Sequence, residues 1–288
     1  MTIAIYGSRR QQAGMRYLVD FLEVLRSRNV DVLMHRKLFD SLLAAEPHAL
    51  AGVCRCISDK VEAADMAVSL GGDGTFLRTV QWLGDLQVPV VGVNSGHLGY
   101  LTALPAEELP RLLDYLSDDA FVIEERALLQ LDSPSLPPSI GTVAVNEIAI
   151  AKEESASMVT AKVSLEGIDL ADYRADGLIV CTSTGSTAYN LSVGGPIVQP
   201  TADVFVISPV AAHSLTMRPM VIGSGFRMTI VPSGRSSHVR LAVDGRSALV
   251  EMGTEICIRP ADRKLSVLLL RDHTFADTLR DKLHWGEN

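Results

Sequence analysis

Cysteine and long apolar stretches are both scarce in this chain, and their scarcity excludes several classes of protein. The 288 residues include only four cysteines, namely Cys54, Cys56, Cys181 and Cys257. This number and spacing fit neither a disulfide framework nor a zinc site, so we expect four ordinary thiols. No stretch reaches the roughly 18 consecutive apolar residues of a membrane-spanning helix. The first ten residues lack the apolar core of a secretory signal, which predicts a cytoplasmic protein without a membrane partner.

Positive charge is also in short supply. The chain has 26 Lys and Arg against 34 Asp and Glu, which gives a formal net charge of −8. Without a global basic field, nucleic acid is not an expected partner. An anionic substrate would have to be attracted locally, by backbone N–H groups, by single arginines or by a divalent cation such as Mg²⁺, and we expect such a cation to take part. The length and the 47% hydrophobic content allow two domains with substantial cores.

The most informative stretch is Leu70-Gly71-Gly72-Asp73-Gly74-Thr75, which follows the apolar run 66–70. It predicts a strand, a tight glycine turn with exposed N–H groups, and a helix over 75–84 whose N-terminus points at the turn. Such a turn binds phosphate. No Lys follows the glycines, so it is neither a Walker A loop nor the GxGxxG fingerprint. A carboxylate at its centre, Asp73, would accept a proton from an attacking hydroxyl or help to hold a metal.

Strands and helices alternate in the first part of the chain. Apolar runs predict strands over 3–7, 30–34, 66–70 and 88–93, and helical spacing predicts helices over 15–28, 39–45, 75–84 and 106–116. This alternation indicates an α/β domain built on an open, mostly parallel sheet. Ligands of such sheets lie outside the carboxyl ends of the strands. The glycine turn and the run 94–100 follow neighbouring strands, and in that run Tyr100 is expected to contact a base or ribose, whereas His97 is more typical of a structural residue.

From residue 121 onward the pattern changes to short alternating runs, which predict a β-rich second domain. The expected strands are 121–131, 143–151, 160–165, 177–181, 204–207, 226–231, 239–243 and 265–270. A short amphipathic helix over 275–285 is expected to pack back on the first domain or on a neighbouring subunit. We therefore place the nucleotide-binding domain at 1–122, the β-rich domain at 123–272 and the C-terminal helix in 273–288.

Two segments of the β-rich part carry polar side chains suited to a nucleotide. Asn146 and Glu147 interrupt an apolar strand, and both can meet one ligand only at a bulge or a strand end; the alternative is a polar edge. Asp176 precedes a buried strand, and five hydroxyls follow in the turn 182–187. These hydroxyls either cap a short helix or bind a ribose. Read together with a phosphate loop upstream, they favour the nucleotide.

Six motifs together resemble one family. They are GGDGT at 71–75, NSGHLGYLT at 94–102, NEIAI at 146–150, DGLIVCTSTGSTAYNLSVGGPIV at 176–198, HSLTMRP at 213–219 and VDGR at 243–246. GGDGT alone is shared by NAD kinases, diacylglycerol and sphingosine kinases and 6-phosphofructokinases. The order and spacing of the whole set are similar to those of bacterial NAD kinases. The NE and TGSTAY segments look specific to NAD kinases, whereas the lipid kinases share only GGDGT and a two-domain plan.

This resemblance implies a reaction and a set of site residues. NAD would bind between the two domains, and its adenosine ribose would be phosphorylated at the 2′-hydroxyl by ATP with a divalent cation, to give NADP. Asp73 would be the general base, and Gly74 would approach phosphate through its backbone. Asn146 and Glu147 would bind ribose and phosphate oxygens. The adenosine would be held by Asp176, with Arg174 beside it, and by Thr187, Ala188, Tyr189, Asn190, Leu191 and Ser192. No residue is assigned to metal, and a homodimer or homotetramer is implied.

The chain also departs from the family pattern. Arg246 stands where many members have Gln, and Ser95 where many have Thr. A guanidinium would suit the new 2′-phosphate. Arg78 and Ala211 complete the expected site, while His213 and Arg218 remain open between the site and a subunit interface. The alternatives to an NAD kinase are a lipid kinase that shares GGDGT and a non-catalytic NAD or NADP sensor. Donor preference, NADH use and feedback inhibition by NADP(H) remain open.

Overall fold

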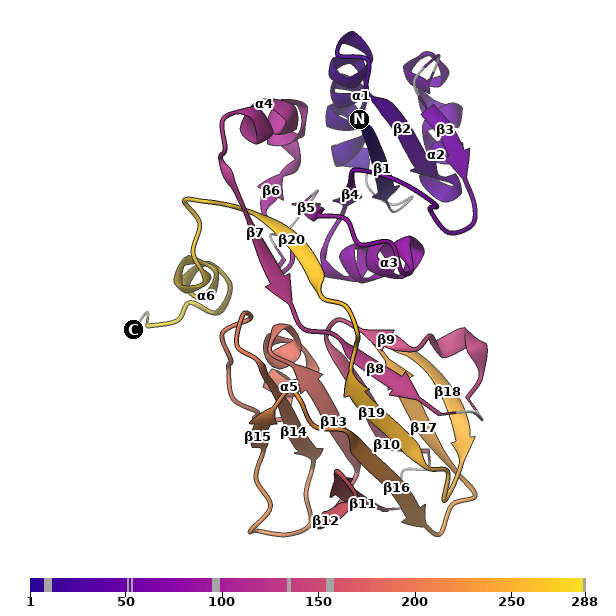
Figure 1. The fold of residues 1–288 in the computed structure, drawn as a ribbon, viewed down its shortest axis with the longest axis vertical. Coiled ribbons are helices and arrows are strands. Elements are labelled where there is room, and N and C mark those ends of the chain that lie inside the picture. The colour runs from indigo at the N-terminus through magenta and orange to yellow at the C-terminus, as the bar shows by residue number, and fades with distance from the viewer. Residues whose placement is uncertain are drawn as a thin grey trace. The chain divides into compact units, whose positions relative to one another are not determined.

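The chain divides into two compact units, each with its own hydrophobic core. The structure is a computed structural model that describes residues 1–7, 12–50, 52, 54–94, 99–133, 136–153 and 158–286. Unit 1 comprises Met1–Glu125 and Leu265–Asn288, and unit 2 comprises Arg126–Lys264. In Figure 1 the two parts of unit 1 appear at opposite ends of the colour scale, because the chain leaves this unit and returns to it near its end.

Unit 1 is built on an eight-stranded sheet in the order β3-β2-β1-β4-β5-β20-β7, with β6 also paired to β5. The pairs β1–β2, β1–β4, β2–β3, β4–β5, β5–β6 and β5–β20 are parallel. The strands are β1 Thr2–Gly7, β2 Asp31–His35, β3 Cys54–Ile57, β4 Met66–Leu70, β5 Val90–Asn94, β6 Leu104–Pro105, β7 Phe121–Arg126 and β20 Leu265–Leu270. This confirms the expected α/β unit with a mostly parallel sheet.

The helices of unit 1 follow the predicted periodicity. They are α1 Gln12–Ser27, α2 Arg36–Ala45, α3 Asp73–Leu83, α4 Leu112–Ser117 and α6 Phe275–Leu283, with 3₁₀ turns η1 Pro47–Leu50 and η2 Ala106–Arg111. Leu18, Phe21, Leu22 and Leu25 of α1 are fully buried, as their spacing predicts. The helix expected over 106–116 instead begins as η2, which contains Pro110. Because proline lacks an N–H and crowds the preceding turn, a regular α-helix starts only after it.

Unit 2 consists of two six-stranded antiparallel sheets with an apolar core between them, as expected for a β-rich domain. The first sandwich sheet has the order β15-β14-β13-β10-β17-β18, and the second has the order β12-β11-β16-β19-β8-β9. The strands are β8 Leu129–Asp132, β9 Val143–Ala144, β10 Glu147–Lys152, β11 Val159–Leu165, β12 Ile168–Ala175, β13 Gly177–Thr182, β14 Val204–Val210, β15 Met220–Gly223, β16 Met228–Gly234, β17 His238–Val243, β18 Arg246–Glu251 and β19 Ile256–Pro260. Short helical turns are η3 Pro138–Ile140, η4 Thr184–Thr187 and α5 Tyr189–Ser192.

One strand lies in a different unit from the one expected. The sequence placed 265–270 in the β-rich domain, but β20 pairs in parallel with β5 and lies between β5 and β7 in the sheet of unit 1. Figure 1 shows it beside β7, in the yellow end of the colour scale. The run expected over 121–131 is likewise two strands, β7 of unit 1 and β8 of unit 2. Apolar alternation reveals a strand but says nothing of the sheet that it joins.

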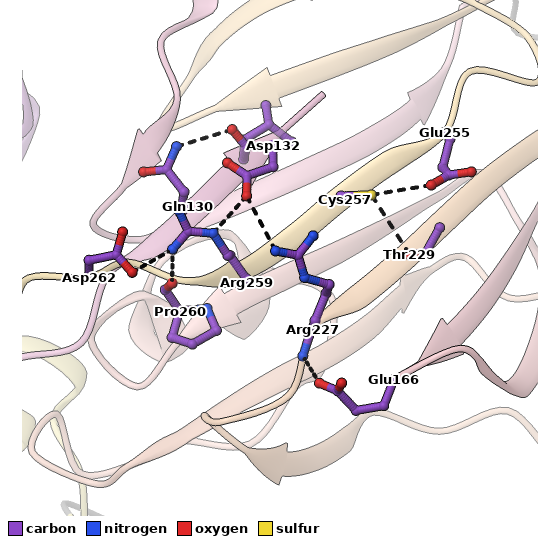
Figure 2. A network of polar contacts seen from close by, with 11 residues as sticks. Gln130, Asp132, Glu166, Arg227, Thr229, Glu255, Cys257, Arg259, Pro260 and Asp262 are labelled. Carbon is purple, nitrogen blue, oxygen red and sulfur yellow. Dashed lines mark hydrogen bonds and ion pairs between the residues drawn. The ribbon is translucent and has the colours of Figure 1, made fainter. Parts of the chain in front are cut away.

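A polar network on the second sandwich sheet ties β8 to β19 (Figure 2). Arg259 donates from Nε to Asp132 at 2.6 Å and from Nη1 to Asp262 at 2.9 Å, and Arg227 Nη2 lies 3.8 Å from the same Asp132 oxygen. The backbone N–H of Arg227 also donates to Glu166. All of these side chains keep some contact with solvent, so each ion pair adds little to stability. The network therefore links β8 and β19 at the surface without contributing much to stability.

Candidate nucleotide site

The glycine turn after β4 places Asp73 at the first residue of α3. Two backbone amides fix its carboxylate: the Tyr100 N–H donates to Oδ2 at 2.9 Å, and the Leu101 N–H donates to Oδ1 at 2.9 Å. These amides follow β5, which pairs with β4, so the ends of neighbouring strands meet here as predicted. A Cβ on Gly99 would lie 1.9 Å from Asp73 Oδ1, so only glycine fits beside the carboxylate. The structure thus holds Asp73 in one orientation and leaves it lone pairs for a further donor.

Tyr100 contributes to this arrangement through its backbone, whereas the sequence singled out its ring. The Tyr100 hydroxyl is buried and has no hydrogen-bond partner among the described residues. Burial, and then the negative charge of Asp73, raise the pKa of this phenol. The contact of its ring with a base or ribose stays a prediction.

Gly74 and Arg78 lie next to Asp73 on α3. Gly74 is exposed, and the nearest atom to a Cβ built on it would be Arg78 Nη1 at 3.8 Å. Arg78 Nη2 donates to the Thr75 hydroxyl at 3.3 Å, which draws the guanidinium back toward the N-terminus of the helix. Asp73, Gly74, Arg78 and the backbone of Tyr100 are therefore together in unit 1, so a phosphate there would meet backbone amides and one guanidinium.

In unit 2, Asn146 and Glu147 lie at a strand end, which is one of the two places where neighbouring side chains can face the same side. β9 ends at Ala144 and β10 begins at Glu147, and Asp244 organises the turn between them. Its carboxylate accepts backbone N–H bonds from Val145 at 2.7 Å, Asn146 at 2.9 Å and Glu147 at 3.2 Å. Sequence reasoning missed this role of Asp244, although VDGR was one of the quoted motifs.

The Asp244-Gly245 pair could have pointed to this role. The pair links β17 to β18 with positive φ at both residues, 45° and 78°. Asp-Gly between two strands is a signature of a tight hairpin, and the Asp side chain is then placed at the hairpin tip. Arg246, directly after the turn, is exposed and packs so close to Gly141 that a Cβ there would lie 2.3 Å from Nη2. Its charge favours the ionised Asp244 and so opposes the rise that burial causes in the pKa of that carboxyl. Arg246 therefore lies near the Asn146–Glu147 turn.

The turn after β13 packs against the same residues. The Thr182 N–H donates to the Asn146 carbonyl at 2.9 Å, and the Thr182 hydroxyl donates to the Val145 carbonyl at 2.6 Å. A Cβ on Gly185 would lie 2.1 Å from the Asn146 carbonyl oxygen, so this contact requires glycine. The backbone N–H of Tyr189 bonds to the Glu147 carboxylate. The structure therefore brings the NE and TGSTAY segments together.

Most hydroxyls of this turn already have partners in the protein. Ser183 donates to the carbonyls of Ala202 and Val204, and Ser186 donates to that of Val198. Thr187 lies 3.4 Å from the Thr184 carbonyl. This favours the structural interpretation for these hydroxyls. The Thr184 hydroxyl is the exception, because it is buried and has no partner within the described chain.

Asn190 also has a structural role. It is fully buried, its amide donates to the Ser186 and Pro196 carbonyls, and it accepts a bond from Ser208 at 2.6 Å. Ser208 on β14 pairs with Ile179 in the middle of β13, so α5 folds back over the outer face of the first sandwich sheet. The Asn190 side chain thus shapes the segment, and a contact of Asn190 with adenosine stays a prediction. Of its neighbours, Tyr189 and Ser192 are exposed, whereas Thr187, Ala188 and Leu191 are half-buried.

A separate group forms where β13 begins. Asp176 forms an ion pair with Lys152, whose Nζ lies 2.8 Å from Oδ1, and the same oxygen lies 3.9 Å from His213 Nε2. The His213 N–H donates to the carbonyl of Arg174, whose side chain is exposed, and Ala211 follows β14 with a positive φ of 48°. His213, left open by the sequence, thus lies with Asp176. Arg218 is different, because its guanidinium bonds to the carbonyls of Leu215 and Met217 in its own loop.

Glu147 is the most perturbed carboxylate of this region. Burial, then repulsion from Asp244, raise the pKa of its carboxyl to about 7 from 4.5, against the bond from the Tyr189 N–H. Its Oε2 is buried and has no partner in the part of the chain that the structure describes. A ribose hydroxyl or another donor at this oxygen would satisfy it and favour the ionised form.

We expect Glu147→Gln to change how stability depends on pH. Between pH 4.5 and 7 the folded protein holds a proton on Glu147 that the unfolded chain has lost, so the free energy of unfolding falls as pH rises through this window. The Gln variant lacks this loss and should be more stable than the parent by up to about 3 kcal/mol at pH 8. Urea unfolding at pH 4 and pH 8 measures it.

The matched control is Glu251→Gln, the same change at an exposed position of β18. The difference in unfolding free energy between Glu251→Gln and the parent should be the same at pH 4 and at pH 8. If the Glu147→Gln difference is as large at pH 4 as at pH 8, burial of the charge is not its cause.

Two expectations lie outside the described residues, namely His97 and Ser95. Among the residues that are described, no helix is long and apolar enough to cross a membrane. Nor do they contain a group of three or more His, Cys, Asp or Glu side chains that could hold a metal. Mg²⁺ commonly keeps its waters and binds one or two carboxylates together with substrate phosphates. The lone pairs left on Asp73 fit that mode.

Comparison with known proteins identifies the family. Residues 14–121 match the ATP-NAD kinase N-terminal domain, and residues 145–270 match the ATP-NAD kinase C-terminal domain. An NAD kinase of Porphyromonas gingivalis is 40% identical over 286 residues, which is 99% of this chain and 98% of that protein. An NAD kinase of Bacteroides fragilis is 36% identical over the same shares of both chains.

Solved structures share the fold. A yeast NADH kinase complexed with NADH aligns with a TM-score of 0.89 and 24% identity, over 100% of this chain and 89% of that one. An NAD kinase from Archaeoglobus fulgidus in complex with ATP aligns with a TM-score of 0.71 and 24% identity, over 95% and 94% of the two chains. The two domain matches and the full-length relatives show that this chain belongs to the NAD kinase family.

Proposed function

We propose that the protein transfers the γ-phosphoryl group of ATP to the 2′-hydroxyl of the adenosine ribose of NAD and so forms NADP. The observation that carries this proposal is the placement of Asp73, because two backbone amides fix its carboxylate beside an exposed glycine and the N-terminus of α3. A fixed carboxylate next to a phosphate cradle is what proton removal during phosphoryl transfer requires. Family membership supports the choice of NAD and ATP.

In the proposed reaction Asp73 takes the proton of the 2′-hydroxyl. The ribose oxygen forms a bond to the γ-phosphorus, the bond from that phosphorus to the β,γ-bridging oxygen breaks, and ADP leaves. Because the transition state is loose, its charge gathers on the equatorial oxygens of the transferred group. In this proposal the Gly74 N–H and the guanidinium of Arg78 stabilise that charge. A divalent cation on the donor phosphates would neutralise part of it.

The other assignments are proposals for unit 2. We infer that Asn146 and Glu147 bind ribose and phosphate oxygens, and that Arg246 near the same turn favours the new 2′-phosphate. The buried, unpartnered Glu147 Oε2 supports this. Tyr189 and Ser192 remain the accessible candidates for adenosine in their segment. We propose separately that Asp176, Arg174 and Ala211, with His213 beside them, form a second region that contacts the nucleotide.

We also infer a cytoplasmic homo-oligomer, either a dimer or a tetramer. Unit 2 exposes several large apolar side chains around β15, which a subunit interface would remove from water. They are Leu215, Met220, Val221 and Phe226.

The test is formation of NADP from NAD, ATP and Mg²⁺, read through an NADP-specific dehydrogenase. We expect turnover that requires all three components, and no phosphorylation of diacylglycerol in a parallel assay. ATP, another nucleoside triphosphate and polyphosphate are each tried as the donor. If NAD binds but none of these donors gives NADP, the protein is a sensor and the proposal fails. The comparisons support neither the lipid kinase nor the sensor.

A further inference from the structure

The C-terminal helix α6 lies at the same edge of unit 1 as Asp73. The side chains of Thr274 and Asp277 cap its first turn reciprocally, so its start is well defined. Near its other end, Asp281 lines a hollow of about 510 Å³ together with Asn94 at the end of β5 and Thr102. The Thr102 hydroxyl accepts from the Gly99 N–H at 2.8 Å, and so belongs to the turn whose next two amides hold Asp73. The last turn of α6 is thus beside the turn 99–102, whose amides hold the Asp73 carboxylate.

Lys282, the next residue of α6, has an unusual environment for a lysine. Its Nζ is buried and has no hydrogen-bond partner among the described residues. Lysine side chains normally extend until the ammonium reaches water. Burial lowers the pKa of this ammonium, while the negative charges of Asp73 and Asp281 oppose that shift. A buried donor without an acceptor in the part of the chain that the structure describes is costly to the protein alone, which indicates that a ligand supplies the missing acceptor.

We propose that the Lys282 ammonium binds the phosphoryl group that moves in the reaction, first on the donor and then as the 2′-phosphate of the product. This inference rests on the proposed function, because Asp73 marks where the 2′-oxygen would lie. An ammonium is a compact charge with three donors, which suits phosphate oxygens. Lys282 would also offset the repulsion between the transferred group and the Asp73 carboxylate.

The experiment compares the binding of NAD and NADP, since these differ only by the 2′-phosphate. In Lys282→Met the dissociation constant of NADP should rise about ten- to hundredfold, which is the range for loss of a charged hydrogen bond. The dissociation constant of NAD should stay the same, and kcat should fall. Lys282→Arg keeps the charge and should recover most of the NADP affinity. Calorimetric titration with each dinucleotide measures the ratio without requiring turnover.

Lys37→Met is the control, because Lys37 lies on the exposed side of α2 and the chemical change is identical. It should leave both dissociation constants and kcat unaltered. If Lys282→Met does not fold, Lys282→Gln tests the same loss of charge, because its terminal amide is polar but uncharged. A thermal melt of each variant accompanies the titrations.

The outcomes separate this inference from the proposed function. If the parent forms NADP but the ratio of NADP to NAD affinity is the same in Lys282→Met, Lys282 has no phosphate contact and the inference fails alone. The inference also fails if both affinities fall together, since that is the result of a structural role. If the parent forms no NADP while the variant loses NADP affinity selectively, the contact stands and the proposed reaction fails.

Discussion

Asp73→Asn should lower kcat for NADP formation by about 10² to 10⁴, which is the usual contribution of a general base, and should leave the affinity for NAD nearly unchanged. The amide keeps the size and shape of the side chain and can still accept one of the two backbone bonds, from Tyr100 or Leu101. It cannot take up the hydroxyl proton. Steady-state kinetics with varied NAD, together with calorimetric titration of NAD, measures both quantities.

Asp85→Asn provides the matched control for this variant. Asp85 follows α3, its side chain is 90% exposed, and among the described residues it forms a long ion pair to Lys60 at 3.9 Å. Its replacement should not alter kcat. If Asp73→Asn turns over within a few-fold of the parent, Asp73 is not the base. If it loses NAD affinity and kcat in the same proportion, Asp73 serves binding instead.

Asp244→Ala is expected to cost at least about 3 kcal/mol of unfolding free energy. Three backbone N–H groups, those of Val145, Asn146 and Glu147, lose their acceptor, and each unsatisfied buried donor costs about 1 to 3 kcal/mol. Relief of the repulsion with Glu147 returns part of this. Alanine also tolerates the positive φ of 45° less well than Asp or Asn does. Denaturant unfolding measures the loss, and the KM for NAD should rise because the Asn146–Glu147 turn loosens.

Two companion variants sharpen this prediction. Asp244→Asn keeps one acceptor oxygen and a side chain suited to positive φ, so it should lose clearly less stability than Asp244→Ala. Asp169→Ala removes an exposed ion pair to Lys162 on a hairpin and should cost under about 1 kcal/mol. Equal losses for Asp244→Ala and Asp169→Ala would show that the three amides find water or other partners.

The sequence predicted the parallel sheet and the glycine turn after β4 because both depend on local chemistry. Buried parallel strands need continuous apolar runs, and the tight turn after β4 needs glycine, so both leave a readable pattern. The meeting of GGDGT with the segment after β5 then follows from strand adjacency. The strand end at Asn146–Glu147 could be anticipated too, because two neighbouring side chains on a regular strand point to opposite faces.

The parts that escaped prediction depend on contacts between distant segments. Nothing in the alternation of 265–270 indicates that β20 pairs with β5 rather than with another strand of the β-rich domain. The hydroxyls of 182–187 look alike in sequence, and only tertiary contacts show that Ser183 and Ser186 are used within the protein. Lys282 looks like an ordinary charged residue of an amphipathic helix, because the burial of its ammonium arises from packing far along the chain.

The position of β20 between β5 and β7 has a consequence for the order in which the chain assembles during synthesis. Unit 2 is an uninterrupted segment, so it can complete both of its sheets as soon as it has left the ribosome. Unit 1 cannot, because β7 has no neighbour on its inner side until β20 is made. The sheet of unit 1 therefore stays incomplete until residues 265–270 are made, although β4, β5 and the amides that hold Asp73 are translated early. We infer that unit 1 completes its sheet only near the end of translation, after the sandwich has already formed.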